Sequence, residues 1–251
     1  MEDPARRKTL FLLNGRRGDP GDLVKPLEAY LPESKAVVTT TRQEAESLIR
    51  HFSHYDIFVA GGGDGTLNTV VNSLAANDLD DKIVGVLPMG TGNDFASVMG
   101  YDVRRFCALK KISRSKHCIK DLYDNLHPLI ATQRGFNDYI AAVDIGVFQA
   151  DDVEPTTWLS SMGVGFYGGV VRALNGATTS SKRYVFKAVQ SFFAQRKRLR
   201  EMLLQYNHGE LKGQYFSVEI MNSPLFGKGL RYCPPSNVRD GKLELVVTCD
   251  I

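Results

Sequence analysis

The stretch YDIFVAGGGDGTLNTVVNSL, residues 55–74, decides the fold of the first half of this chain. A short apolar run leads into three glycines, Asp64 and a fourth glycine, and apolar residues then recur at helical spacing from Leu67 to Leu74. This order predicts a buried strand, a glycine-rich loop and the first turns of a helix. Glycines permit close approach to the backbone, and a helix N-terminus attracts anions, so the pattern predicts a phosphate site. A carboxylate in the middle of such a site needs an explanation.

Three more segments of the first hundred residues repeat this strand–loop–helix order. The apolar runs 8–14, 35–39, 56–60 and 82–88 alternate with helical patterns, which is typical of βαβ units and a parallel sheet. The carboxyl ends of parallel strands lie at one edge of the sheet, where ligands bind. We therefore expect four loops to meet at that edge, namely Asn14–Gly18, Thr39–Thr41, Gly61–Thr66 and Gly90–Asp94.

The pattern changes after about Val103. The runs 139–148, 214–223, 230–236 and 242–248 resemble antiparallel strands joined by turns, and a helix is predicted over 181–206. The fold class is accordingly an α/β nucleotide domain with a parallel sheet, residues 1–103, followed by a β-rich, sandwich-like domain, residues 104–251.

Composition excludes several classes of protein. The net charge of +3 over 251 residues is too small to indicate a nucleic-acid partner, and the four cysteines form no CxxC pair. No apolar run approaches the ~20 residues of a membrane span, and the N-terminus lacks a signal-peptide pattern. We expect a cytoplasmic protein whose membrane contact, if any, is peripheral.

The glycine loop matches neither of two familiar phosphate loops. A Walker A loop requires a lysine after the glycines, and this loop has none. Thr66 stands where the GxGxxG fingerprint has its last glycine. The segment LPMGTGNDFA, residues 87–96, repeats the design on the next strand and carries Asp94. A carboxylate beside a phosphate is repulsive, so a magnesium ion or a lysine is expected to neutralise the two aspartates.

Together, GGGDGTLN and LPMGTGNDFA resemble the diacylglycerol kinase catalytic domain, the group that includes bacterial lipid kinases, ceramide kinases and sphingosine kinases. The late segment PPSNVRDGKLELVV is similar to another part of that family. The resemblance implies two domains with the active site between them, ATP as phosphoryl donor, and a lipid hydroxyl of diacylglycerol or sphingoid type as acceptor. Phosphoryl transfer chiefly requires positioning and charge neutralisation.

The resemblance also implies roles for individual residues. The nucleotide would be surrounded by residues of the four loops: Asn14, Thr40, Gly61, Gly62, Gly63, Asp64, Gly65, Thr66, Leu67, Asn68 and Thr91. An acidic network would be formed by Asp64, Asp94 and Asp144 and closed by Lys182. A magnesium ion would be held by Asp240 with the carbonyls of Asn237 and Lys242.

Two departures from the family pattern bear on activity. Thr69 stands where the family has an acidic residue, and the DGE motif that supplies the expected general base would lie beyond Ile251. We therefore expect a fragment, or a shortened relative of impaired activity. Within these residues Asp64 is the remaining candidate for the base.

Alternative interpretations remain open at this point. The chain resembles a lipid kinase most, but NAD kinases share the GGDGT-type loop, and a non-catalytic nucleotide or lipid binder fits the missing base. The span Lys182–Arg200 is rich in Lys and Arg and holds no acidic residue. It is either a solvated helix or a surface for anionic membrane. The identity of the lipid and the oligomeric state are not predicted.

Overall fold

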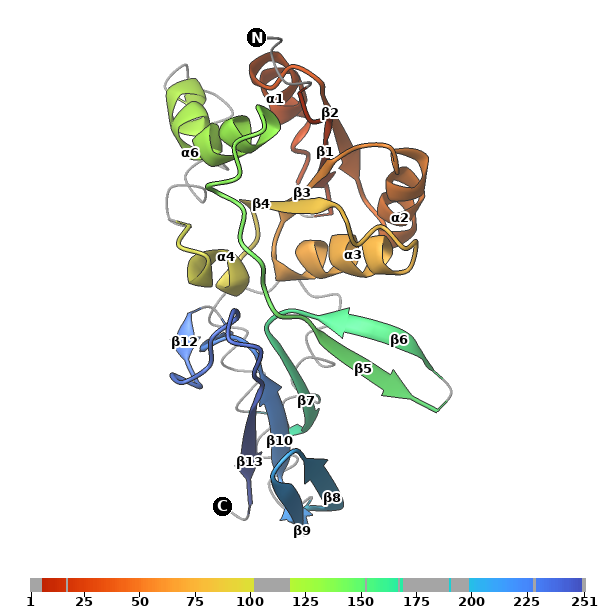
Figure 1. The fold of residues 1–251 in the computed structure, drawn as a ribbon, viewed down its shortest axis with the longest axis vertical. Helices are drawn as coiled ribbons and strands as arrows, with labels where there is room; N and C mark the ends of the chain where they lie inside the picture. The colour runs from red at the N-terminus through yellow and green to blue at the C-terminus, as the bar shows by residue number, and fades with distance from the viewer. Residues whose placement is uncertain are drawn as a thin grey trace.

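The computed structural model describes residues 6–16, 18–101, 118–151, 153–166, 168, 190, 199–227 and 229–249. In Figure 1 the N-terminal half forms a helix-covered sheet, and the strands of the C-terminal half extend away from it.

A four-stranded parallel sheet forms the centre of the N-terminal half, in the order β2-β1-β3-β4. Its strands are β1 (Thr9–Asn14), β2 (Ser34–Thr39), β3 (Ile57–Gly62) and β4 (Ile83–Pro88). β3 is buried along its whole length and β1 along nearly all of it, as expected for inner strands covered on both faces.

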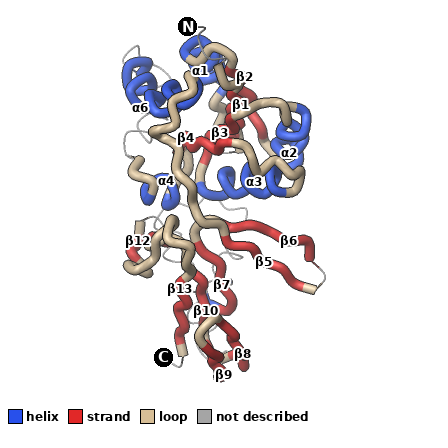
Figure 2. Tube along the Cα trace, viewed as in Figure 1, coloured by secondary structure: helices blue, strands red, loops and turns tan. Residues whose placement is uncertain are grey.

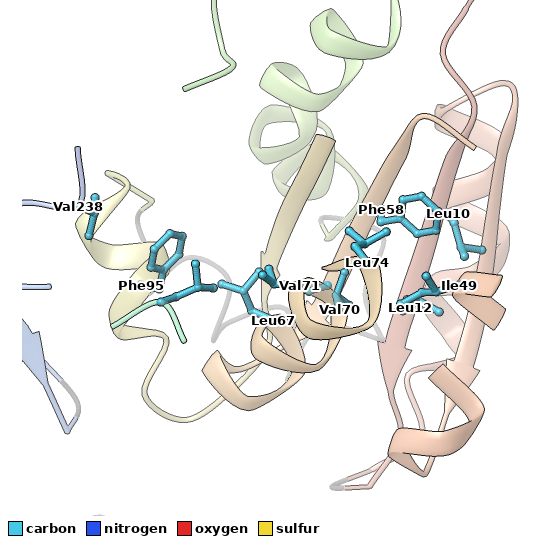
Figure 3. Close-up of a cluster of buried hydrophobic side chains, with 12 residues drawn as sticks. Leu10, Leu12, Ile49, Phe58, Leu67, Val70, Val71, Leu74, Phe95 and Val238 are labelled. Atoms are coloured by element: carbon cyan, nitrogen blue, oxygen red, sulfur yellow. The ribbon is translucent and has the colours of Figure 1, made fainter. Parts of the chain in front are cut away.

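Helices cover both faces of this sheet. The helices of this half are η1 (Gly21–Leu23), α1 (Val24–Tyr30), α2 (Arg42–His51), α3 (Asp64–Ala75), α4 (Asp94–Val98) and α6 (Cys118–Gln133). On one face, Leu27 of α1 and Ile130 of α6 pack into a buried cluster with the sheet. On the other face, Ile49 of α2, Val70 of α3 and Phe95 of α4 form a second cluster (Figure 3).

Local sequence accounts for where α2 begins. The Thr41 hydroxyl accepts a hydrogen bond from the Glu44 N–H, and the Glu44 carboxylate accepts one from the Thr41 N–H. This capping box satisfies two backbone donors that the first turn of a helix would otherwise leave unpaired. The pKa of Glu44 lies below its usual range. The main cause is the hydrogen bond from the Thr40 backbone N–H, and the next is the hydrogen bond from the Thr40 side chain.

Figure 2 shows several strands in the described part of the C-terminal half, and these strands pair in antiparallel fashion. A three-stranded sheet has the order β13-β10-β7, and three two-stranded units pair β5 with β6, β8 with β9 and β11 with β12. The strands are β5 (Gly146–Ala150), β6 (Val153–Trp158), β7 (Ser161–Gly165), β8 (Arg200–Tyr206), β9 (Gly209–Tyr215), β10 (Ser217–Met221), β11 (Leu225–Phe226), β12 (Leu230–Arg231) and β13 (Glu244–Thr248). The predicted fold class is thereby confirmed.

The boundary between the two domains stays a prediction. The sequence pattern places it near residue 103, whereas Leu126 and Ile130 of α6 pack into the core of the parallel sheet. In the C-terminal half, Leu159 and Val238 join the cluster around α3. The two halves therefore share apolar packing.

One predicted helix is partly wrong. Residues 200–206 were expected to end a helix that begins at 181, but they form β8 and pair with β9 from Arg200↔Tyr215 to Tyr206↔Gly209. Adjacent apolar residues such as Leu203 and Leu204 suit either a helix or a strand, so periodicity alone could not separate the two. Apart from Gln190, the rest of that helix up to residue 198 lies outside the described residues. Within the described part of the chain, no helix is long and apolar enough to cross a membrane.

Candidate active site

The four predicted loops follow the four parallel strands and begin at the same edge of the sheet. Asn14 at the end of β1 pairs with Thr39 at the end of β2, and Gly62 at the end of β3 pairs with Pro88 at the end of β4. β1 and β3 are joined in register as well. The arrangement places the candidate nucleotide residues of four separate segments side by side.

Packing restricts three glycines at the junction of β3 and α3. A Cβ on Gly61 would lie 2.5 Å from Leu13 Cδ2, and a Cβ on Gly62 would collide with the Thr66 side chain. A Cβ on Gly63 would lie 3.1 Å from the Gly90 Cα, so the two glycine loops touch through their backbones. These close neighbours account for glycine at the three positions.

Gly65 is different. It lies in the first turn of α3, is exposed, and a Cβ placed on it would meet nothing within 4 Å. Its φ is not positive, so the left-handed conformation does not demand glycine either. Of the glycines whose surroundings the structure describes, it alone combines open space with an ordinary φ. Neither packing nor backbone geometry explains this glycine.

The loop after β1 is tied to the glycine loop. The Asn14 side-chain amide donates a hydrogen bond of 2.7 Å to the Thr66 hydroxyl, and its Oδ1 accepts one from the Arg16 N–H. Both residues were predicted to contact the nucleotide, and the structure brings them together. Thr40 instead turns its hydroxyl to the Glu44 carboxylate at 3.1 Å.

The remaining predicted nucleotide residues differ in exposure. Leu67 is 3% exposed and belongs to the core cluster around α3, so its side chain faces away from solvent. The Asn68 carbonyl accepts a hydrogen bond from the Asn72 side chain. Thr91 is exposed in the loop after β4.

Asn93 shapes that second loop. It adopts a left-handed conformation with φ 60°, which asparagine tolerates better than most residues. Its Oδ1 accepts a hydrogen bond from the Gly90 N–H at 2.9 Å, and its amide donates to the carbonyls of Gly90 and Pro88. The loop is thereby closed on itself before α4 begins.

Asp64 joins the two glycine loops. Its carboxylate accepts hydrogen bonds from the N–H groups of Asp94 at 3.2 Å and Phe95 at 3.0 Å, which are the first residues of α4. A carboxylate at a helix N-terminus is stabilised both by these donors and by the helix dipole. The partners of Asp64 among the described residues are therefore backbone N–H groups.

Asp94 lies next to Asp64 and reaches the C-terminal half. Its carboxylate is buried and accepts a hydrogen bond of 2.6 Å from the Gly229 N–H, in the turn between β11 and β12. A Cβ on Gly92 would lie 3.2 Å from Asp64 Oδ2 and 3.9 Å from Asp94 Oδ2, so the two carboxylates border the same loop.

The third predicted acid lies at the predicted magnesium site. Asp144 accepts a hydrogen bond of 2.8 Å from the Gly241 N–H and donates its own N–H to the Val238 carbonyl. The loop is closed further by Asp240, which accepts from the Lys242 N–H, and by Asn237, which accepts from the Arg239 N–H. Lys182, the predicted cation of the network, lies outside the described residues.

The donors of this loop are chemically suited to magnesium. Carboxylate and carbonyl oxygens are the ligands that Mg²⁺ takes, and it commonly keeps several waters. The loop offers the carboxylate of Asp240 together with main-chain carbonyls, and it brings the Asp144 carboxylate to the same segment. Among the described residues no group of three His, Cys, Asp or Glu side chains could hold a metal ion. A magnesium ion at this loop would therefore take most of its ligands from carbonyls and water.

Sequence reasoning did not single out three residues whose hydrogen bonds connect the segments. Asn72 of α3 bonds the backbone of Thr157, Asn222 bonds the carbonyls of Asp144 and Leu159, and Gly229 bonds Asp94. A signal existed only for Asn72, because it lies on the apolar face of α3 between Val71 and Leu74, where a polar side chain needs a partner.

Residues 8–121 match a family model described as the diacylglycerol kinase catalytic domain. Over these residues the chain is similar to the catalytic domain of the diacylglycerol kinase family. The resemblance predicted from the two glycine loops is confirmed.

Other comparisons extend beyond this catalytic domain. The chain is 23% identical over 246 residues to a protein of Alcanivorax borkumensis named "Probable lipid kinase YegS-like", and the match covers 96% of this chain and 73% of that protein. It is 39% identical over 99 residues to a diacylglycerol kinase of Staphylococcus aureus, which is 39% of this chain and 30% of that enzyme. These two relatives are thus named as a probable lipid kinase and a diacylglycerol kinase.

The fold is similar to that of a diacylglycerol kinase from Bacillus anthracis whose crystal structure is known. The TM-score is 0.64 at 19% sequence identity, and the similarity covers 97% of this chain and 74% of that one. At this identity the likeness shows a common fold, including the strand-rich region that follows the diacylglycerol kinase catalytic domain.

Proposed function

We propose that this protein transfers the γ-phosphoryl group of ATP to the hydroxyl of a lipid of diacylglycerol or sphingoid type. ATP would bind at the carboxyl edge of the parallel sheet, where the loops after β1, β2, β3 and β4 begin. The family match over residues 8–121 supports a kinase, and the names of the relatives support a lipid acceptor.

The observation that carries the nucleotide part of the proposal is Gly65. A glycine in the first turn of a helix is less favourable there than alanine, yet nothing in the described surroundings excludes a side chain at this position. Room for a phosphate group at the N-terminus of α3 explains the glycine, because the first backbone N–H groups of a helix bind anions. The contact between Asn14 and Thr66 holds the adjoining loop in place.

The chain's own residues have distinct roles in this proposal. The α3 N-terminus and the Asn14–Thr66 pair orient the phosphates, while Asp64 fixes the second glycine loop by holding the start of α4. Asp240, with the carbonyls of Asn237 and Lys242, would hold a magnesium ion that stabilises the loop next to Asp144. The role of Asp64 as proton acceptor stays a prediction. Both of its carboxylate oxygens already accept hydrogen bonds from the start of α4, which weakens it as a base.

Membrane contact is a further part of the proposal. A lipid acceptor implies that the protein works at a membrane surface, and the basic span Lys182–Arg200 is the predicted contact. Of that span, the structure describes only Gln190, Leu199 and Arg200. The proposed membrane contact therefore rests on the charge pattern of the sequence alone.

Gly65→Leu tests the nucleotide site. We expect Mg-ATP binding, measured by calorimetry, to weaken about tenfold or more, because the new side chain enters the space of the phosphate, and its Cβ would meet no protein atom within 4 Å. Ala75→Leu is the matched control, since it places the same side chain at an exposed position of the same helix. Unchanged ATP affinity of Gly65→Leu would overturn the assignment of the site.

Labelled ATP with a panel of diacylglycerol, ceramide and sphingoid bases then tests the acceptor. Transfer of label to one class of lipid alcohol is the expected result. ATP binding without any labelled lipid would contradict the kinase assignment and favour a non-catalytic nucleotide binder.

A further inference from the structure

Asn72 makes a paired contact between the two halves of the molecule. Its amide nitrogen donates to the Thr157 carbonyl at 2.9 Å, and its Oδ1 accepts from the Thr157 N–H at 2.7 Å. The same nitrogen also donates to the Asn68 carbonyl at 2.8 Å, one turn back along α3. One side chain thus bonds the nucleotide helix and both backbone groups of a residue in β6.

The Thr157 segment is held from the other side as well. Asn222, at the end of β10 and fully buried, donates to the Leu159 carbonyl at 2.7 Å, and the backbone N–H groups of Asn222 and Ser223 donate to the Ser160 carbonyl. The four residues 157–160 therefore form a strap between α3 and the three-stranded sheet, with one asparagine at each side.

Two other polar side-chain groups of the strap make no hydrogen bond to α3. The Thr157 hydroxyl and the Trp158 indole nitrogen are buried and have no hydrogen-bond partner among the described residues. The Leu159 side chain packs among the apolar residues around α3, which is attractive but not directional. Among these groups the Asn72 amide supplies the directional contacts between α3 and the strap.

We propose that Asn72 is a positioning residue that fixes the strand-rich half against the nucleotide helix, and so sets the lipid acceptor relative to the phosphoryl donor. The acceptor part of this inference rests on the proposed function. The packing part does not, because it follows from the contacts with Thr157 and Asn68. Phosphoryl transfer depends on the alignment of donor and acceptor, so a small misplacement lowers the rate without weakening nucleotide binding.

Asn72→Leu is the first test, with Asn77→Leu as the matched control. Asn77 follows α3 and its amide donates only to the Ser73 carbonyl, within the same segment. We expect scanning calorimetry to resolve two unfolding transitions for Asn72→Leu and a single one for the native chain and Asn77→Leu. We also expect amide exchange at Thr157 to accelerate about tenfold or more, because its N–H loses a buried acceptor.

Kinetics separate positioning from a merely structural role. For Asn72→Leu the lipid kcat/KM should fall about tenfold or more, while the KM for ATP stays within about twofold. Asn72→Asp is the second variant should the first fail to fold. It keeps an acceptor for the Thr157 N–H but turns a carboxylate oxygen toward the carbonyls of Asn68 and Thr157, so faster exchange at Thr157 and a lower lipid kcat/KM are expected here as well.

The outcomes distinguish this inference from the proposed function. A native chain that binds no Mg-ATP would overturn the proposed function, and unfolding and Thr157 exchange would still decide whether Asn72 joins the halves. If Asn72→Leu matches Asn77→Leu in unfolding and exchange, the positioning role is overturned. An equal loss of ATP affinity and lipid turnover would also overturn it.

Discussion

The Asp64 carboxylate accepts a hydrogen bond of 3.0 Å from the Phe95 N–H, 31 residues further along the chain. The acidic residue in the middle of this glycine-rich loop is thereby explained by its contacts with the start of α4. It caps the helix that follows the second glycine loop, and it accepts from Asp94 N–H in the same way. Two loops that look alike in sequence are thus parts of one hydrogen-bonded unit.

Replacing this cap should loosen the second loop. We expect Asp64→Ala to lower the free energy of unfolding by ~1–2 kcal/mol and to accelerate amide exchange at Asp94 and Phe95, because two N–H groups lose their acceptor. Asp64→Asn keeps one acceptor oxygen and should lie between. Urea unfolding and exchange by mass spectrometry measure both effects. Asp138→Ala, at an exposed loop position, is the control, and identical exchange in Asp64→Ala and Asp138→Ala would contradict the capping role.

Magnesium should stabilise the loop of Asp240. A ligand that binds only the folded state at about 100 times its dissociation constant adds ~2.7 kcal/mol of stability, so Mg²⁺ should raise the melting temperature of the native chain. Asp240→Asn should abolish this increase, and Asp151→Asn, at an exposed turn, should retain it. The comparison is made at equal ionic strength with KCl. A response that survives in Asp240→Asn would place the ion elsewhere.

Glu219 should make stability depend on pH. This carboxyl is 1% exposed in β10; burial raises its pKa above the usual range, and the hydrogen bonds from Ser217 and Tyr232 oppose that shift. The folded chain then keeps a proton that the unfolded chain has lost, so this contribution is present at low pH and is lost as pH rises above the unfolded value of 4.5.

Glu219→Gln should remove that dependence. Urea midpoints of the native chain should fall more steeply than those of Glu219→Gln as the pH is raised from about 4.5. The exposed Glu210→Gln is the matched control and should follow the native chain. Parallel profiles for all three proteins would show that Glu219 titrates normally.

Thr41→Ala should destabilise α2. The substitution removes the hydroxyl that accepts the Glu44 N–H, and the loss of an N-cap typically lowers the free energy of unfolding by ~1 kcal/mol. Thermal or urea unfolding measures this change. Thr156→Ala is a suitable control, because its hydroxyl bonds only a nearby carbonyl in an exposed hairpin. An effect no larger than that of the control would mean that the capping box contributes little.

The parallel sheet, its four loops and the helix pattern were predictable because each depends on neighbours within a few residues. The apolar runs of β1 and β3, the glycines before α3 and the Thr41–Glu44 pair all act locally. Motif order also identified the family that the comparison over residues 8–121 confirms. The failure at residues 200–206 is of another kind, since those residues become a strand only by pairing with β9.

The sequence by itself determined the strand–loop–helix order, the position of the two glycine-rich loops and the change to antiparallel strands. Only the tertiary structure decided what the polar side chains bind. Asp64 meets α4, Asn72 meets a strand 85 residues away, and Asp94 meets a turn 135 residues away. The physical reason is that propensity and periodicity act over one or two turns of chain, whereas a buried polar group takes whichever donor or acceptor the packing of distant segments brings within hydrogen-bond distance.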